Sequence, residues 1–427
     1  MTVPIAAKLS AHAQLREVIA GARIRAIYQP IVDLASGTPV AYEALARGPE
    51  GSSLETPGAL FGAAARADMV AELDRACRDA AVEGALLAGL RPPHTLFVNV
   101  EPSAIVGSEP LLAHEDELAA GNLRVVVEFT ERALAARPAE VLAAVGWLRQ
   151  RGVGIALDDV GVDERSLALM PFLAPDVIKL DMSLVQQRGT TRATARVLNA
   201  VAAEAERSGA TLLAEGIETE EHLARARAIG ATLGQGWLLG RPGPLVPEPM
   251  VADRVRLRSS GVTPVGTPFE LIADRRRVRH GDKRLLLALS RQLEAEADGL
   301  GGEVVVLASF QDAGFFTTRS RDRYEQLARS AALVGALGTG MSEEPAPRVR
   351  GADLKQDEAL KDEWNVVVIS PHFAGAFVAR DLGDADVSDS DRRFDFFVTY
   401  ERELVARAAH ALMARIYPQR TGSASIP

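Results

Sequence analysis

Short apolar runs alternate with helix-length amphipathic stretches along the first 245 residues of the chain. Runs rich in valine, isoleucine, leucine and phenylalanine are typical of buried strands. The pattern predicts strands at Ile24–Asp33, Val40–Leu45, Leu96–Val100, Arg124–Phe129, Gly154–Asp159, Val177–Leu180, Thr211–Glu215 and Leu233–Leu238. Helical stretches separate most successive strands, which favours a parallel sheet of the α/β class.

The number and spacing of these strands indicate one particular architecture. Eight strand–helix units within 245 residues are typical of a (β/α)8 barrel of the TIM type. A doubly wound open sheet is the alternative, because it shows the same alternation of strands and helices. In the barrel, the C-terminal ends of the strands would converge on one mouth.

A change in composition marks the end of the barrel. The stretch from Leu245 to Thr267 contains three prolines and no sustained apolar period, which is typical of a domain boundary. We therefore expect a barrel over residues 1–245, a linker over 246–267, a second domain over 268–420 and a polar tail over 421–427.

The second domain is predicted to be a smaller α/β unit. Its expected elements are helices Lys283–Ala297, Tyr324–Ala336 and Tyr400–Ile416 and strands Glu303–Phe310, Asn365–Ser370 and Phe394–Thr399. Its phenylalanines are interpreted as core residues rather than as a cofactor site; they are Phe310, Phe315, Phe316, Phe394, Phe396 and Phe397.

Composition and charge exclude several classes of protein. The single cysteine, Cys77, rules out an internal disulfide and any cysteine-rich metal site. No apolar run is long enough to span a membrane, so we expect a cytoplasmic protein. The net charge is −9 and neither part of the chain is basic, which argues against binding to a nucleic acid polymer.

Polar residues stand near the C-terminal ends of seven expected strands. They are Glu43, Asn99, Glu128, Asp158 with Asp159, Lys179, Glu215 and Gln235. Five carboxylates at one barrel mouth would repel one another and take up protons unless cations were present. Oxygen ligands without paired histidines or cysteines suit Mg²⁺ or Mn²⁺.

The adjacent pair Asp158 and Asp159 can approach two ions from different sides. Two ions about 3.5–4 Å apart suit phosphodiester hydrolysis by in-line attack of a metal-activated water. Lys179 is a further candidate, because every other basic residue between Lys8 and Lys283 is arginine. A compact ammonium can hold a water or a phosphate oxygen where a guanidinium fork would not fit.

The ordered motifs resemble the EAL domain, a modified TIM barrel that hydrolyses the bacterial second messenger cyclic di-GMP. The similarity runs from about Ile24 to Pro244 through YQPIVDLASG, YEALAR, FVNV, VEFTER, LDDVG, IKLD, AEGIET and QGWLLGRP, with Glu43-Ala44-Leu45 as the signature tripeptide. The resemblance implies a metal-dependent enzyme that opens cyclic di-GMP to linear pGpG, and a homodimer.

The resemblance also implies a role for each matched residue. Glu43, Asn99, Glu128, Asp158 and Asp159 would hold two Mg²⁺ or Mn²⁺ ions. Lys179, Glu215 and Gln235 would act with Glu43 in catalysis by positioning or activating water. Substrate contacts would come from Gln29, Arg47, Arg241 and Pro242, and Glu131 would support the loop that follows Asp159.

That loop departs from the family pattern. Val160 replaces an aromatic residue, and Val162, Asp163, Glu164 and Arg165 replace small and hydroxyl residues. The second hypothesis is therefore a catalytically weak or inactive receptor for cyclic di-GMP. A signalling scaffold without nucleotide binding is the third hypothesis.

The second domain resembles the DICT domain, a sensory module. The similarity rests on FTTRSRDRYEQLARSAALVGALG, LKDEWNVVVISP and RRFDFFVTYERELV. It implies that this domain regulates the barrel by binding a signal or a signalling partner.

Overall fold

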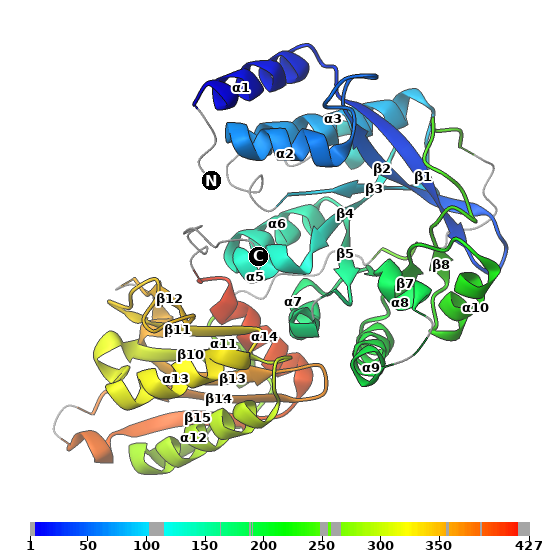
Figure 1. Cartoon of the computed structure of the whole chain (residues 1–427). Helices are drawn as coiled ribbons and strands as arrows, with labels where there is room; N and C mark the ends of the chain where they lie inside the picture. The colour runs from blue at the N-terminus through cyan, green and yellow to red at the C-terminus, as the bar shows by residue number, and fades with distance from the viewer. Residues whose placement is uncertain are drawn as a thin grey trace.

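The computed structural model describes residues 5–101, 115–162, 164–187, 189, 191–247, 255–257, 266–355, 358–384 and 387–416. Eight strands close into a barrel in sequence order, which confirms the predicted fold class (Figure 1). The strands are β1 (Arg25–Asp33), β2 (Pro39–Arg47), β3 (Thr95–Asn99), β4 (Arg124–Thr130), β5 (Gly154–Val160), β6 (Val177–Leu180), β7 (Thr211–Ala214) and β8 (Leu233–Gly234).

The first strand corrects the expectation of an all-parallel barrel. β1 pairs antiparallel with both β2 and β8, whereas the pairs from β2 to β8 are parallel. The short connection between Asp33 and Pro39 has no room for a crossover helix, and antiparallel strands can be joined by such a turn. The register places Gln29 opposite Glu43, so both residues lie at the same level of the barrel.

Helices surround the barrel between the strands. They are α1 (Ile5–Ala20), α2 (Pro57–Ala67), α3 (Val70–Leu87), α4 (Glu115–Ala119), α5 (Glu131–Ala136), α6 (Pro138–Gln150), α7 (Met170–Leu173), α8 (Met182–Gln186), α9 (Arg192–Ser208) and α10 (Glu220–Ala228), with a 3₁₀ turn η2 at Glu164–Leu169. The side chain of Thr191 caps the first turn of α9, and Gly209 ends that helix in the left-handed region. None of the described helices is both long and apolar enough to cross a membrane.

The expected strand Leu233–Leu238 is shorter in the structure, because β8 ends at Gly234. The chain at Gly236 has φ +154°, and a Cβ there would lie 2.2 Å from the carbonyl oxygen of Ile217. This close backbone approach requires glycine and turns the chain away from the sheet directly after Gln235.

Part of the predicted linker packs on the barrel. Val255 is buried with Ile31, Phe97 and Val126 in the interior of the barrel. The Arg124 guanidinium donates to the Val255 carbonyl at 2.6 Å. Most of the remaining linker, and the tail 421–427, lie outside the described residues.

The second unit is built on a seven-stranded mixed sheet of order β12-β11-β10-β13-β14-β15-β9. The strands are β9 (Arg279–Asp282), β10 (Val305–Asp312), β11 (Leu333–Thr339), β12 (Arg350–Asp353), β13 (Glu363–Ile369), β14 (Ala374–Asp381) and β15 (Arg393–Thr399). The helices are α11 (Pro268–Ala273), α12 (Lys283–Gly299), α13 (Thr318–Ser330) and α14 (Arg402–Met413).

The predicted helix Tyr324–Ala336 is wrong beyond Ser330. Helix α13 ends there, and Leu333 begins β11, which lies between β10 and β12. The run of alanine and leucine from Ala328 to Leu337 suits a helix locally, but its part from Leu333 to Leu337 is buried in the sheet as a strand. Tertiary packing has therefore overridden helix propensity.

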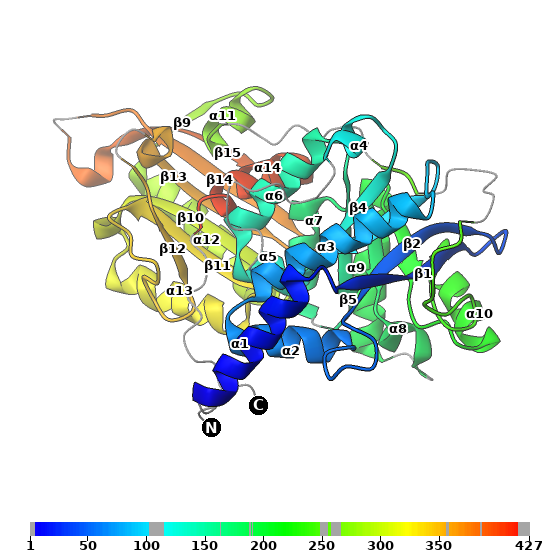
Figure 2. The ribbon, with the colours of Figure 1, turned by 90° about the horizontal axis from the view of Figure 1, so that it is seen from above.

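Helices cover both faces of this sheet. α12 and α13 pack on one face, while α11 and α14 pack on the other, which faces the barrel (Figures 1 and 2). One buried apolar cluster includes Leu142 of α6, Phe172 of α7 and Leu412 of α14. The two units therefore share a continuous hydrophobic contact layer.

Candidate active site at the barrel mouth

One buried lysine lies at the centre of the polar residues near the strand ends. Only 1% of the Lys179 side chain is exposed, and its Nζ lies 2.8 Å from Glu128, 3.0 Å from Asp158, 2.9 Å from Glu215 and 3.7 Å from Glu43. The four carboxylates come from β4, from β5, from the residue after β7 and from β2. The structure thus brings together residues that are far apart in the sequence, as the barrel hypothesis predicts.

Amides surround the Glu43 carboxylate. Asn99 Nδ2 donates to Glu43 Oε1 at 3.1 Å, and Gln235 Nε2 donates to Glu43 Oε2 at 2.7 Å. Gln235 Nε2 also lies 3.1 Å from Gln29 Oε1, and Gln29 donates in turn to the Gly240 carbonyl at 3.0 Å. This chain of hydrogen bonds fixes the Glu43 side chain in one orientation.

Two consecutive aspartates both reach the mouth because the backbone is irregular there. In a regular strand their side chains would point to opposite faces. Asp159 has φ +59°, and the pairing of β5 with β6 shifts register between Leu157 and Val160. Carboxylate oxygens of Asp158, Asp159 and Glu215 consequently lie within 4.8 Å of one another. A left-handed non-glycine residue is strained and is often found at a functional site.

The close carboxylates perturb one another's proton affinity. Burial raises the pKa of Glu128 well above its usual range, against the opposing effect of Lys179. Burial likewise raises the pKa of Glu215 to about 7 and raises the pKa of Asp159. Burial alone would lower the pKa of Lys179, but Asp158, Glu128, Glu215 and Glu43 together raise it. The ammonium therefore stays charged.

The donor set fits divalent cations. Four carboxylates contact the single ammonium of Lys179 and a fifth, Asp159, lies beside them, so negative charge remains in excess. The buried Glu128 Oε2 has no hydrogen bond or ion pair among the described residues. An unpaired buried carboxylate oxygen is costly in free energy unless a cation or a proton balances it. Oxygen-only ligands of this kind match the coordination preferences of Mg²⁺ and Mn²⁺.

The predicted substrate residues divide into two groups. Gln29 is part of the Glu43 network, and Arg241 and Pro242 follow Gly240, the residue that Gln29 contacts. Arg241 is exposed and stacks on Trp237 at 4.7 Å. By contrast, Arg47 donates to the Ala46 carbonyl at 2.8 Å and makes no contact with the carboxylates in the described part of the chain.

The predicted loop-support residue Glu131 begins α5, but its side chain lies outside the described residues. The same holds for Asp163 and for the side chains of Glu164 and Arg165 in the altered loop. In the described part of that loop, Val160 is buried and Val162 is 53% exposed.

A cleft of about 610 Å³ lies beside the mouth, and sequence reasoning did not identify several of its residues. Asn99 and Asp159 line it together with Asp74, Arg78 and Glu101. Asp74 and Arg78 form a buried ion pair one helical turn apart on α3, and Asp74 also accepts from the Glu101 amide at 3.0 Å. The only sequence signal was this acid–base spacing, which is more commonly a solvated helix face.

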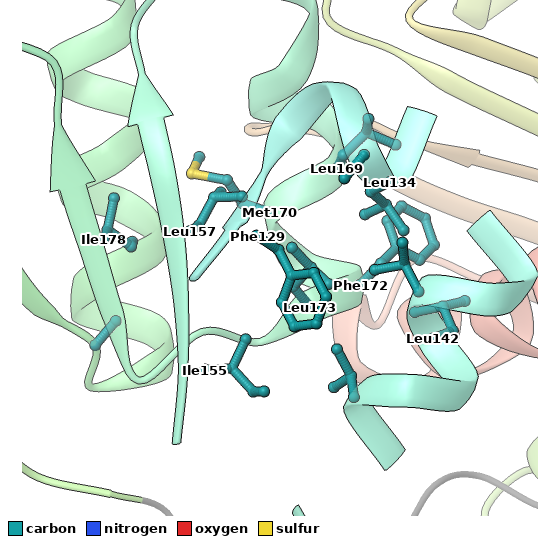
Figure 3. Close-up of a cluster of buried hydrophobic side chains, with 14 of the residues drawn as sticks. Phe129, Leu134, Leu142, Ile155, Leu157, Leu169, Met170, Phe172, Leu173 and Ile178 are labelled. Carbon is teal, nitrogen blue, oxygen red and sulfur yellow. The ribbon is translucent and has the colours of Figure 1, made fainter. Parts of the chain in front are cut away.

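Apolar packing supports the strands that carry Glu128 and Asp158. Phe129 and Leu157 of these strands pack with Leu134, Met170 and Phe172 from the helices that follow (Figure 3). All five side chains are buried. The positions of these strand ends therefore depend on α5 and α7.

A closed α/β barrel with a carboxylate-rich mouth defines the class of protein. The family model of the EAL domain matches residues 12–242, more than half of the chain, and the chain belongs to this family. A second family model, described as a sensory domain in diguanylate cyclases and two-component systems (DICT), matches residues 274–382. Both resemblances inferred from the sequence motifs are thus confirmed.

Several curated relatives are named as phosphodiesterases. The chain is 34% identical over 161 residues to cyclic di-GMP phosphodiesterase RocR of Pseudomonas aeruginosa, covering 37% of this chain and 41% of RocR. It is 31% identical over 248 residues to NbdA of the same organism, covering 56% of this chain and 31% of NbdA. The chain thus spans less than half the length of these relatives.

Solved structures of EAL proteins are also similar. The manganese and cyclic di-GMP complex of Klebsiella pneumoniae BlrP1 is 29% identical, with a TM-score of 0.46 over 52% of this chain and 56% of that chain. The cyclic di-GMP complex of the phosphodiesterase PaMucR is 25% identical, with a TM-score of 0.48 over 55% of this chain and 98% of that chain.

Proposed function

We propose that the barrel hydrolyses cyclic di-GMP to linear pGpG in a reaction that depends on divalent cations, Mg²⁺ or Mn²⁺. The observation that supports this most directly is the cluster of carboxylates around Lys179 at the mouth. Membership of the EAL family and the names of RocR and NbdA supply the substrate.

In this proposal Glu43, Asn99, Glu128, Asp158 and Asp159 hold two cations. Their positions bring four carboxylates and an amide oxygen to one mouth. Cations bound there would neutralise charge on the phosphate and lower the pKa of an attacking water.

Three other side chains handle water and protons. Lys179 donates hydrogen bonds to a water or a phosphate oxygen from a fixed, buried position. Glu215, whose pKa burial raises to about 7, suits proton uptake near neutral pH. Gln235 orients Glu43 through the 2.7 Å hydrogen bond.

Substrate contacts are assigned to the edge of the mouth. The cleft lined by Asn99 and Asp159 gives room for part of the dinucleotide. We assign further contacts to Gln29, which lies beside Gln235 and Gly240, and to Arg241 and Pro242, which follow Gly240. We place Arg47 at the phosphate, since a guanidinium can bind it through two hydrogen bonds.

We also propose that the DICT domain regulates the barrel through α5. The Arg350 guanidinium donates to the carbonyls of Ala135 at 2.8 Å and Ala136 at 3.1 Å. These residues form the last turn of the helix that starts directly after β4, the strand of Glu128. A displacement of the second domain would therefore act on a candidate metal ligand through one short helix.

The test is to incubate the full chain with cyclic di-GMP and Mg²⁺ or Mn²⁺ and to measure linear pGpG by chromatography. Glu43→Gln should reduce turnover at least about 10³-fold, because it removes one central carboxylate while keeping the side-chain shape. Glu50→Gln, an exposed glutamate that follows the same strand, is the matched control and should retain activity. Equal turnover in Glu43→Gln would refute the proposal.

The receptor hypothesis is the second candidate, because Val162 and its neighbours alter the loop beside Asp159. It predicts tight calorimetric binding of cyclic di-GMP without any product. Product formed by the wild-type chain and not by Glu43→Gln would reject it.

A further inference from the structure

The second domain contains a pocket that no part of the proposed function uses. It has a volume of about 230 Å³ and lies between α12, α13 and the 3₁₀ turn η3 (Ala313–Phe315), on the sheet face that is turned away from the barrel. Figure 1 shows α12 and α13 on this side, with α14 on the opposite side towards the barrel. A ligand there would contact neither the barrel mouth nor the interface between the domains.

Four aromatic side chains line this α12–α13 pocket. Phe310, Trp364 and Phe394 come from three strands of the sheet, and Phe315 comes from η3. Trp364 lies edge-on to Phe394 with ring centroids 6.1 Å apart. Phe394 is buried, whereas Phe315 is 41% exposed. A flat aromatic ligand can pack against the rings of Trp364 and Phe394 on one side and against the partly exposed ring of Phe315 on the other.

An irregular strand end shapes one side of the pocket. The pairing of β10 with β11 shifts register between Ser309 and Asp312, and Gln311 has φ +60°. A β-bulge re-aims the side chains around it. Phe310 and Gln311 at this bulge both line the pocket. Strain of this kind is more common at binding sites than in purely structural strands.

The charges of the side chains that line the pocket do not sum to zero. Glu294 is buried and is bound by Arg323 at 2.6 Å and by the Tyr324 hydroxyl at 2.8 Å. Lys283 pairs with Asp389 at 2.6 Å. Arg291 has no hydrogen bond or ion pair among the described residues, so one positive charge is left over.

The unpaired positive charge determines which ligand charge the pocket favours. Lys283 lies 4.8 Å from the ring centre of Phe315 and already occupies a cation site on it. Arg323 already neutralises the buried carboxylate. A second cation would therefore meet positive charge, whereas an anion could pair with Arg291.

We infer that the α12–α13 pocket binds a small aromatic carboxylate of one or two rings, with the ring on Trp364 and Phe315 and the carboxylate on Arg291. The volume sets the size, because pockets for larger organic ligands commonly exceed about 300 Å³. This inference goes beyond the proposed hydrolysis and does not depend on it.

The test is isothermal titration calorimetry of the full chain, in the presence of a chelator, with benzoate, indole-3-acetate and 1-naphthoate. Naphthalene-1-methanol and benzyltrimethylammonium serve as neutral and cationic comparisons. Arg291→Gln removes the unpaired charge, and Trp364→Leu removes the largest aromatic surface. Arg319→Gln is the matched control, because Arg319 is exposed on α13 outside the pocket.

We expect saturable binding of at least one carboxylate, weakened roughly tenfold by Arg291→Gln and unchanged by Arg319→Gln. Arg291 is a surface residue, so Arg291→Gln should leave the fold intact. The test therefore remains valid even if Trp364→Leu unfolds the domain. The inference is overturned if none of the three carboxylates binds. It is also overturned if Arg319→Gln weakens binding equally, or if the cation binds as tightly as the carboxylates.

Discussion

The barrel mouth and the α12–α13 pocket use charge in opposite ways. At the mouth, one buried lysine contacts four carboxylates, and negative charge remains in excess. In the pocket, Glu294 is paired with Arg323, Asp389 is paired with Lys283 and Arg392, and four aromatic rings contribute to the lining. The first arrangement suits metal-dependent phosphate chemistry, and the second suits recognition of an organic anion.

Replacing a lysine by methionine in each region should have different effects on stability and activity. Lys179→Met should destabilise the fold by roughly 3 kcal/mol, because it leaves several buried carboxylates without a cation. It should also lower hydrolysis of cyclic di-GMP about 10³-fold. Lys283→Met should cost less than about 1 kcal/mol, because its partner Asp389 is 67% exposed. Urea unfolding and the chromatographic assay measure both effects.

Metal addition sharpens this prediction. Without its ammonium, the Lys179→Met mouth carries more uncompensated negative charge, so Mn²⁺ should raise its melting temperature more than that of the wild type. If Lys283→Met were destabilised as strongly as Lys179→Met, or if Mn²⁺ had no effect on either variant, the contrast between the two regions would be lost.

The two regions also differ in how much of them the sequence predicts. At the mouth, strand ends are recognisable as apolar runs that finish in Glu128, Asp158 or Lys179, and the barrel topology alone brings them together. The same reasoning named Asp159 as a candidate ligand beside Asp158, but it could not predict the φ of +59° and the register shift that bring this side chain to the mouth. The role of Arg47 stays a prediction from the motif, because its side chain contacts the Ala46 carbonyl in the structure and its expected partner is the substrate phosphate.

The pocket was not predictable from the pattern. Of the phenylalanines predicted as core residues, Phe310 and Phe394 are buried, but the prediction is wrong for Phe315, which lies on the 3₁₀ turn and is 41% exposed. The pocket exists because a bulge, a 3₁₀ turn and two helices leave space above these rings. Such space depends on tertiary packing, which leaves no periodic signal in the sequence. The expected homodimer and the cytoplasmic location stay predictions, because a single chain tests neither.

The contact between the DICT domain and α5 of the barrel gives the second prediction. Arg350→Gln removes the hydrogen bonds to Ala135 and Ala136 and loosens α5, so it should lower kcat for cyclic di-GMP about fivefold with little change in KM. Arg348→Gln is the matched control, because Arg348 is exposed two residues away. Steady-state kinetics of both variants measure the effect. Equal kcat in the two variants would argue against regulation through α5.

The smallest expected effect concerns the pH dependence of the domain interface. His410 of α14 lines a cleft with α6 residues that include Leu142, Trp147 and Gln150. Burial lowers the pKa of His410, and its Nε2 has no hydrogen bond among the described residues. The unfolded chain therefore takes up this proton more readily than the folded chain, so stability is lost as the pH falls below about 6.5.

His410→Gln tests this sign, because glutamine stays neutral at every pH used. Melting temperatures from pH 5.0 to 7.5, measured with a chelator, should show a constant difference between the two chains above about pH 7. Below that, the wild type should lose roughly 2 °C more than His410→Gln. The carboxylates of the mouth titrate equally in both chains and cancel in the difference. A difference that stays constant down to pH 5.0 would mean that His410 is solvated, and that α14 packs less tightly on α6 than the buried cluster indicates.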